Sequence, residues 1–495
     1  MYSRGYLVCW ALVITMGNFE LGYANNIINV LWDFTPCIFG FPPTRRRWIN
    51  TGANIIFPLS ACIGGGIAWV FARYGKRKAL ILSASISILG GSIKMIRAYP
   101  AYLLGRGIMG LAFGITNSIS PMFVSEISPP KMRGILMCFI ALWVNIGLLT
   151  PMFLNLKLPV FIKPFSRTPG YCNPLIGQHI IWREMFAPPI IFAFIQLICL
   201  LFIFKKENPI YEEYLISKSD SYDTSGDFGG EESFQDEEFS TNIQQATISP
   251  PTRMEKDTWK VLCRRRGKRK LMAGIILRSI IQLSGTYIVL NFAFTLRINP
   301  NSTHWNLRLL IAVLGIFLVP VSMILLTYCK RKKLLLIGFL ISCLCLTVLF
   351  QASLQVSYTD YGVPMFSGIP NILSTIFVLI FAVNFRITLA STFYVYCAEV
   401  LTDKGMAMAT LAHWLINGIV LLLPTIAFRI SDLAGTYIRF HESNALFFFI
   451  FGGFCIASFF LITIALKETF GKTRAQISEA FGKNNYHSFK SVIPS

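Results

Sequence analysis

The stretch LLLIGFLISCLCLTVLFQASL, residues 334–354, decides the fold class of this chain. It contains no charged side chain, and the basic run from Lys330 to Lys333 stands directly before it. The hydrocarbon core of a bilayer is about 30 Å thick, and a helix of about 20 apolar residues crosses it. The stretch is therefore predicted to be a membrane-spanning helix with its basic end at the membrane surface.

Apolar stretches of similar length recur along the whole chain. Spans one to six and spans seven to twelve are closely connected, whereas residues 205–270 separate the two groups. We therefore expect an all-α integral membrane protein with twelve transmembrane helices in two six-helix bundles. The predicted spans are 6–30, 48–72, 79–99, 101–124, 134–156, 185–204, 271–295, 306–328, 334–354, 367–396, 405–429 and 444–466.

The composition of the 495 residues supports a membrane protein and argues against a soluble one. Hydrophobic residues make up 54% and charged residues 14% of the chain, whereas soluble domains carry about 25% charged residues. The formal net charge is +21, but the basic residues form short clusters between apolar runs. Such clusters fit loops that face anionic lipid, so we expect a bilayer and no nucleic acid as partner.

The basic clusters also predict the orientation. Arg73 to Lys78, Lys131 with Arg133, and Lys330 to Lys333 fall on one side, together with the central segment and both termini. By the positive-inside rule that side is cytoplasmic, although Arg45 to Arg47 fall on the other side. The first apolar run is too long for the apolar core of a signal peptide, so it is predicted to be the first span. The expected location is the plasma membrane.

Two features of the predicted outside loops follow from this topology. Asn301-Ser302-Thr303 is a glycosylation sequon in the loop after span seven. Cys37 and Cys172 lie in outside loops and could form a disulfide, whereas most of the twelve cysteines lie within apolar runs. No cysteine or histidine spacing suits a metal site, so no metal is expected.

The segment between the two groups changes character twice. Residues 217–240 are rich in Ser, Asp, Glu and Gly and have too little apolar surface to fold, so they are predicted to be disordered. Residues 264–270 are strongly basic and suit either an orienting cluster or an anionic-lipid site. The predicted organisation is a bundle over 1–204, a cytoplasmic linker over 205–270, a second bundle over 271–466 and a cytoplasmic tail over 467–495.

Short motifs give the chain a resemblance to a known family. Residues 105–110 (GRGIMG), followed by 121–129 (PMFVSEISP) and Arg133-Gly134, resemble the fourth helix and next loop of the sugar porters of the major facilitator superfamily. The facilitative glucose transporters are the most similar branch. Further matching motifs are 73–77 (RYGKR), 207–209 (ENP), 282–285 (QLSG), 398–399 (AE) and 468–473 (ETFGKT). The resemblance implies facilitative carriage of a hexose by alternating access, without a cofactor.

The resemblance also implies a charged gate at the cytoplasmic helix ends. Arg73, Arg77, Glu126 and Arg133 match the first half of this gate, where opposite charges pair when the inside is closed. In the second half Glu399 matches the gate glutamate. The position expected to hold its arginine partner is Met406, with Lys404 nearby, so a weaker gate is expected there.

The implied sugar site is partly kept and partly altered. Gln282 and Asn417 match family amides, Trp414 matches the aromatic residue, and His413 and Asn291 are further candidates. Several polar positions depart from the family pattern, and each lost hydrogen bond to a neutral group costs about 0.5–1.5 kcal/mol. The departures are Ala141, Ile281, Tyr287, Gly315, Arg386 and Tyr394. Tyr287 and Arg386 are themselves candidate substrate-binding residues.

Two charged residues within the predicted spans are further candidates, because buried charges in membranes are costly. Glu20 lies one turn before the position where proton-coupled relatives carry an aspartate, which here is Ala24. Glu20 could line the cavity, bind a proton or pair with a cation, for which Arg386 is the most plausible partner. Arg386 could instead bind an anionic substrate, which would make the protein an organic-anion carrier.

The sequence also bears on two other classes of function, a sensor or scaffold and a membrane enzyme. The altered contacts also fit a transport-incompetent relative that acts as a sensor or scaffold. A membrane enzyme is not expected, because no nucleophile–base cluster, phosphate loop or metal-ligand set is evident among five histidines and the acidic residues. The oligomeric state is left open.

Overall fold

The computed structural model of the chain describes residues 4–31, 35–41, 46–129, 132–156, 181–203, 259–292, 305–355, 357–358, 364–365, 369–433 and 440–482. Nearly all of these residues are helical, as predicted. The exception is a pair of two-residue strands, β1 Ser357–Tyr358 and β2 Pro364–Met365, which pair antiparallel beyond the end of a helix.

The N-terminal half contains the elements between residues 4 and 203. Its first span is interrupted by a short 3-10 helix, η1, that joins α1 to α2. The bounds are α1 Arg4–Thr15, η1 Met16–Asn18, α2 Phe19–Val30, α3 Thr35–Ile38, α4 Arg46–Ala72, α5 Lys76–Lys94, α6 Tyr99–Ile127, α7 Arg133–Leu156, α8 Ile181–Glu184, α9 Pro188–Ile198 and η5 Cys199–Ile203.

The C-terminal half follows after residue 258. Two of its spans are interrupted, one between α13 and α14 and one by the π-helix η7. The bounds are α12 Trp259–Cys263, α13 Arg265–Gln282, α14 Thr286–Phe292, α15 Trp305–Tyr328, α16 Arg331–Leu354, α17 Ile369–Asn384, η7 Phe385–Leu389, α18 Ala390–Val400, α19 Asp403–Leu433, α20 Phe440–Ala465 and α21 Arg474–Gly482.

Ten helices of the described part of the chain are long and apolar enough to cross a membrane. The two other predicted spans, 79–99 and 185–204, correspond to α5 and to α9 with η5. In α5 the basic residues at both ends lower the hydropathy, and the second helix, Pro188–Ile203, is shorter. The predicted spans therefore agree with the helices, with ends that differ by a few residues.

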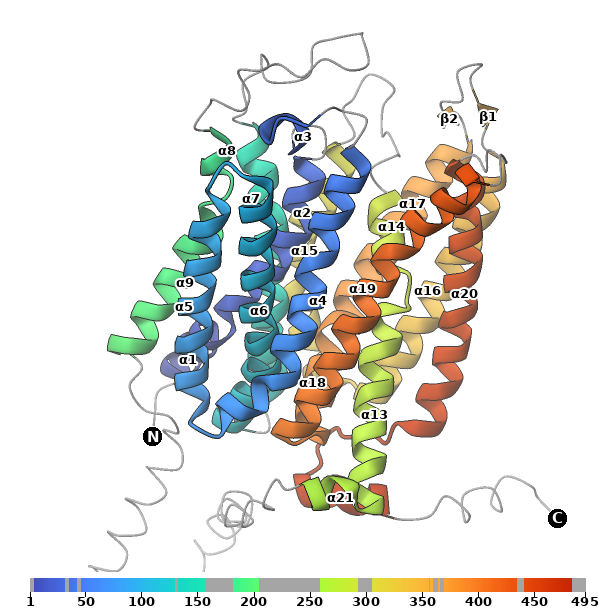
Figure 1. The fold of residues 1–495 in the computed structure, drawn as a ribbon. Helices are drawn as coiled ribbons and strands as arrows, with labels where there is room; N and C mark the ends of the chain where they lie inside the picture. Colours follow the sequence, from blue (N-terminus) through green and yellow to red (C-terminus); the bar gives the residue numbers. More distant parts are fainter. Residues whose placement is uncertain are drawn as a thin grey trace, which may run out of the picture.

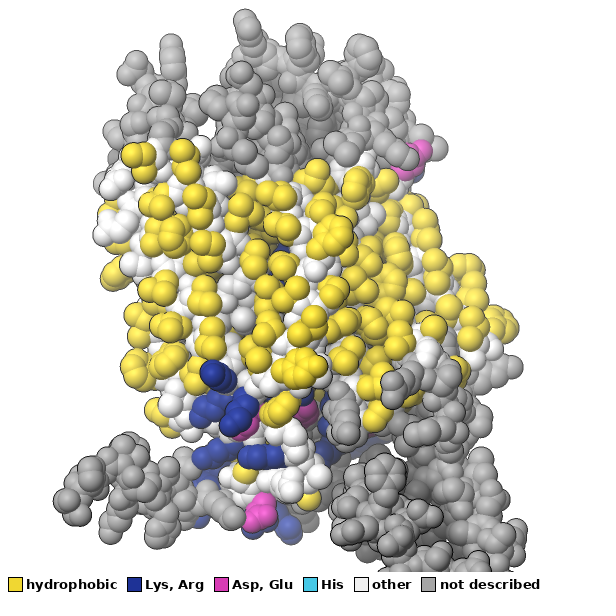
Figure 2. All heavy atoms as spheres, turned by 180° about the vertical axis from the view of Figure 1, so that it is seen from behind, with side chains coloured by type: hydrophobic (Ala, Val, Ile, Leu, Met, Phe, Trp, Pro, Cys, Tyr) yellow, Lys and Arg dark blue, Asp and Glu magenta, His cyan; other side chains and the backbone are white. Residues whose placement is uncertain are grey.

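The two halves stand side by side, with α21 beneath them (Figure 1). Across their interface α4 packs against α19, and α7 packs against α15. Large apolar side chains such as Phe202, Phe317 and Phe449 are exposed on the outer surface, as expected for helices in lipid. Figure 2 shows such side chains across the middle of one face and Lys and Arg gathered below them.

We call the end that carries α21 and the first residues of α5, α7, α13 and α16 the basic end. Two glycines with positive φ separate consecutive helices, one at this end and one near the middle of the molecule. Gly75, with φ +115°, separates α4 from α5, a conformation that residues with a side chain rarely adopt. Gly285, with φ +82°, likewise ends α13 before α14 begins, near the middle of the molecule.

Glycines pack differently in the two halves. In the N-terminal half, a methyl group on Gly22, Gly64 or Gly114 would overlap the backbone carbonyl oxygen of Val144, Leu111 or Ala61 of the neighbouring helix. In the C-terminal half, a methyl group on Gly274, Gly315 or Gly338 would meet side-chain atoms first. Small residues allow such close helix contacts in membranes.

Some predictions lie outside the described residues. These are the disordered linker, the sequon at Asn301, Cys172 and the side chain of Cys37. The side chain of Asn291 is also not described, although its backbone lies in α14.

Candidate functional site

A cavity of about 230 Å³ lies between the two halves. Its walls come from α2 and α7 of the N-terminal half and from α13, α14, α15, α17, η7, α18 and α19 of the C-terminal half. The volume lies just below the range of about 300–1,000 Å³ for pockets that hold drug-sized ligands, so it suits a smaller solute. Among the predicted binding residues, the lining includes Gln282, Tyr287, Arg386, His413, Trp414 and Asn417.

Gln282, His413 and Asn417 form one hydrogen-bonded chain along the cavity wall. Nδ1 of His413 lies 2.8 Å from the carbonyl oxygen of Arg278, and a carbonyl only accepts, so Nδ1 carries the hydrogen. In the neutral ring Nε2 then accepts from Nε2 of Gln282 at 2.7 Å. Asn417 donates through Nδ2 to Oε1 of Gln282 at 2.9 Å. The chain fixes the orientation of both amides and leaves further donor and acceptor sites for a solute.

Trp414 supplies an aromatic wall that is held from both sides. Its ring contacts Phe113 and His413 edge-on, with centroid distances of 5.1 and 5.0 Å. Its indole nitrogen donates to Oδ1 of Asn117 at 3.4 Å. Because Phe113 and Asn117 belong to α6, the tryptophan of α19 is positioned by the opposite half.

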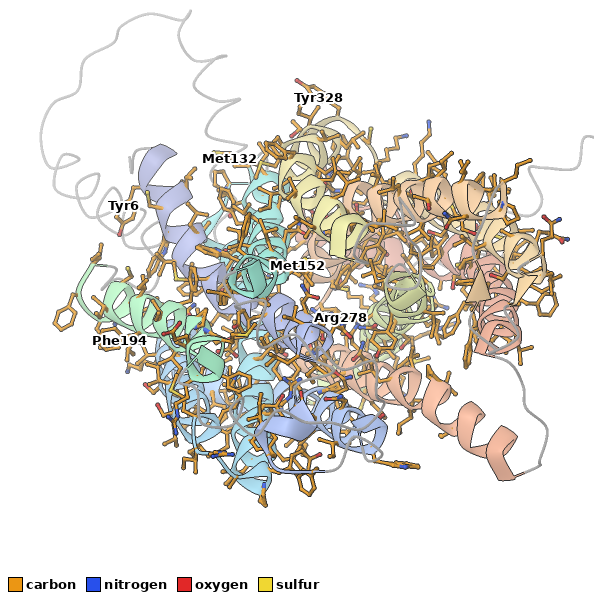
Figure 3. The ribbon with its side chains drawn as sticks, turned by 90° about the horizontal axis from the view of Figure 1, so that it is seen from above. Tyr6, Met132, Met152, Phe194, Arg278 and Tyr328 are labelled. Carbon is orange, nitrogen blue, oxygen red and sulfur yellow. The ribbon has the colours of Figure 1, made fainter. Side chains whose placement is uncertain are left out.

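Arg278, which the sequence reasoning missed, lies beneath the cavity. It is completely buried, and Nη1 donates to Oδ1 of Asn117 at 3.1 Å and to Oγ1 of Thr410 at 2.7 Å. Asn117 in turn donates to the hydroxyl of Tyr394 at 2.9 Å. Figure 3 shows Arg278 near the middle of the molecule, whereas Tyr6, Phe194 and Tyr328 lie at its outer edge. Its position inside predicted span 271–295 was the signal that could have revealed it.

Arg386 lies in the cavity wall within η7. A π-helix has i to i+5 hydrogen bonds, and such turns often occur at functional sites. The guanidinium lies against Gly315, since a methyl group there would overlap Nη1 of Arg386. Oδ1 of Asn145 borders the same space and has no hydrogen-bond partner in the described structure. Among the described residues, no carboxylate pairs with Arg386.

The prediction that Glu20 lines the cavity or pairs with Arg386 is wrong. Glu20 is absent from the cavity lining and is buried inside the N-terminal half, where it interacts electrostatically with Lys94. Lys94 is also buried, with Nζ 3.6 Å from Sδ of Met109 and 4.8 Å from the ring centre of Phe186. Glu20 follows η1 in an interrupted helix, and helical spacing alone does not give its direction.

The positions that depart from the family pattern surround the same cavity. Ala141, Ile281, Gly315 and Tyr394 all line it, together with the asparagines Asn25, Asn26, Asn29 and Asn145 of the N-terminal half. The lost family contacts are thus accompanied by amides elsewhere. No Asp or Glu is among the described residues that line the cavity.

At the basic end, an ion-pair cluster joins the halves through Lys76 and not through the predicted Arg73 or Arg77. Lys76 at the start of α5 contacts Glu126 at the end of α6, and its Nζ lies 2.9 Å from Oδ1 of Asp403 at the start of α19. Arg77 instead donates to the carbonyl oxygen of Leu200 at 2.9 and 2.7 Å. Arg73 lies 4.2 Å over the ring of Trp69. Successive residues of a helix point in directions about 100° apart, so Lys76 and Arg77 of α5 face different neighbours.

A second cluster closes the same end around Glu399. Nη2 of Arg331 lies 3.6 Å from Oε1 of Glu399, and Arg133 of the N-terminal half interacts with the same carboxylate electrostatically. The partner expected from the sequence at Met406 is thus replaced by Arg331. Arg474 of α21 donates to the hydroxyl of Ser125 at 3.1 Å, so the helix after span twelve also contacts the other half.

The fold and the cavity define a polytopic membrane carrier of the major facilitator type. The xylose–proton symporter XylE, solved with 6-bromo-6-deoxy-D-glucose, superposes with a TM-score of 0.71 at 20% identity, covering 97% of this chain and all of that one.

The chain belongs to the sugar (and other) transporter family, whose model matches residues 10–481. Similar relatives include the facilitated glucose transporter member 3 of Oryctolagus cuniculus, 24% identical over 96% of this chain and 92% of that protein. Another is hexose transporter 1 of Plasmodium knowlesi, 22% identical over 93% of this chain and 90% of that protein. The family is one of transporters.

Proposed function

We propose that this protein moves a hexose or a related small sugar across the membrane by facilitative alternating access. The observation that carries the proposal is the cavity between the halves, with amides fixed by the Gln282 chain and the aromatic wall of Trp414. Amides that hydrogen-bond hydroxyl pairs, beside an aromatic face, suit a sugar ring. The family and the names of its relatives support the same substrate class.

The contacts at the basic end support the alternating-access part of this proposal. The Lys76–Asp403 pair and the Arg474–Ser125 bond join the halves only while this end is closed. Opening it separates these groups and gives the cavity access to that side. The cavity lining also supports a facilitative mechanism. Among the described residues that line it there is no Asp or Glu to carry a proton together with the solute.

Uptake of labelled hexoses by liposomes that contain the purified protein tests the proposal. We expect saturable uptake that is inhibited by unlabelled sugar and unchanged by an imposed pH gradient. Protein-free liposomes are the control. Uptake no faster than this control for every sugar would overturn transport, and acceleration by an inward proton gradient would overturn the facilitative mechanism.

We further propose that the basic end faces the cytoplasm of the plasma membrane, with both termini on that side. Orientation is tested in sealed right-side-out vesicles. External protease is expected to spare residues 217–260, and Asn301→Gln is expected to abolish any glycan shift. Cleavage of that segment from outside would reverse the orientation.

A further inference from the structure

Arg386 brings a positive charge into the cavity that no described protein group neutralises. It lines the cavity, and its guanidinium makes no hydrogen bond or ion pair with the described residues, whereas its backbone oxygen accepts a bond of 3.1 Å from Oγ of Ser322. The neighbouring oxygen of Asn145 belongs to a neutral amide, which can accept a hydrogen bond but cannot cancel the charge. A lone cation at membrane depth is costly, so a partner from outside the protein would be strongly favoured.

The surroundings of the cavity add to this excess of positive charge. The described lining contains no carboxylate, and the buried Arg278 beneath the floor adds a second cation whose Nη1 donates only to neutral oxygens. Glu20, the one buried carboxylate among the described residues of the N-terminal half, interacts with Lys94 and does not line the cavity. Gly315 leaves open the space that Arg386 occupies, because a side chain there would overlap the guanidinium.

We infer that the transported solute is a sugar acid, whose carboxylate binds Arg386 while its hydroxyls bind the amides of Gln282 and Asn417. This inference rests on the proposed function, because it names the class of sugar. A guanidinium presents parallel donors that match the two oxygens of a carboxylate. One lining cation balances a single negative charge, so a monocarboxylate fits better than a phosphate ester with two charges.

Binding is tested first, because it does not depend on transport. The melting temperature of the purified protein in detergent is measured with D-glucuronate, D-glucose or glucose 6-phosphate. Glucuronate is expected to raise it most. Arg386→Gln is expected to weaken the apparent affinity for glucuronate about tenfold or more, and that for glucose far less. Arg386→Lys keeps the positive charge but loses the parallel donors of the guanidinium, so it should retain part of the affinity for glucuronate. Arg97→Gln, on an exposed arginine outside the cavity, should behave like the wild type.

Transport in liposomes then separates the inference from the proposed function. Glucuronate uptake is expected to be saturable, to be accelerated by an inside-positive membrane potential and to be lost selectively in Arg386→Gln. Uptake of glucose without binding or uptake of glucuronate would overturn the inference and leave the proposed function standing. Stronger binding of glucose 6-phosphate than of glucuronate would overturn the monocarboxylate class. Glucuronate binding that Arg386→Gln leaves unchanged, in a folded protein, would also overturn the inference.

Discussion

The two halves share an architecture but differ in the charge that they place at the cavity and in the packing of some of their glycines. The N-terminal half buries Glu20 with Lys94 and Arg106, so its buried side chains away from the cavity include both acidic and basic ones. The C-terminal half places Arg278 beneath the cavity and Arg386 in its wall, without a paired carboxylate among the described residues. A methyl group on Gly274, Gly315 or Gly338 of this half would meet side chains first, whereas one on Gly22, Gly64 or Gly114 of the N-terminal half would meet backbone. From this difference we predict a rigid N-terminal half and a C-terminal half that adapts to the solute.

The largest expected effect is on the packing of the N-terminal half. Gly22→Ala would place a methyl group on the carbonyl oxygen of Val144, and backbone cannot move aside as a side chain can. Overpacking typically costs about 1–3 kcal/mol, and a backbone clash belongs at or above the upper end. We expect mostly misfolded protein in size-exclusion profiles after mild heating. Gly453→Ala is the control, because no atom lies within 4 Å of the added methyl. Equal profiles for the two variants would contradict the rigid N-terminal half.

A smaller effect is expected from the ion pairs that connect the halves. Lys76→Gln removes the charge that holds both Glu126 and Asp403, and charge-assisted hydrogen bonds contribute about 1.5–3 kcal/mol. Because the pair with Asp403 crosses between the halves and is broken when the basic end opens, the variant should open this end more often. Reaction of the buried Cys138 and Cys397 with a thiol reagent, followed by mass spectrometry, should become faster. The exposed Lys78→Gln is the matched control, and equal rates in both variants would remove Lys76 from the gate.

The hydrogen-bonded chain in the cavity should affect affinity more than stability. Gln282→Ala removes the bonds to His413 and Asn417 and one solute contact, each worth about 0.5–1.5 kcal/mol. We expect the KM for the transported sugar to rise about tenfold. Gln351→Ala, on an exposed amide of α16, should leave KM unchanged. A KM that stays the same in Gln282→Ala would place the solute elsewhere.

The smallest effect on stability is expected at the glycine beside Arg386. Gly315→Ala meets first the end of a flexible side chain, so the guanidinium can move and the fold should be retained with a loss of about 1 kcal/mol or less. Displacement of Arg386 should nevertheless lower the ratio of glucuronate to glucose uptake a few fold. Together with Gly22→Ala this variant sharpens the comparison, since the same substitution should damage the fold in one half and selectivity in the other. A large loss of stability in Gly315→Ala would contradict this difference between the halves.

The sequence predicted the membrane spans well because hydropathy depends on composition along one helix and not on its neighbours. Motifs also led to Gln282, His413 and Asn417, which the structure brings to one cavity wall; their role in binding stays a prediction. The partners of charged residues were harder to predict. Lys76, Arg331 and Arg278 act across helices that are far apart in sequence, and the direction of Glu20 depends on the interruption at η1.

The π-helix in span ten has a consequence for how this protein can change over time. Its wider turn accommodates one residue more than a regular helix, so the segments before and after it keep their faces toward the same neighbours. Deleting a single residue within 385–389 would restore a regular turn while leaving Asn384 bonded to Gly338 and Glu399 beside Arg331. A change of one codon could thus replace the side chain in the cavity wall without disturbing the Arg331–Glu399 pair at the far end of the same helix.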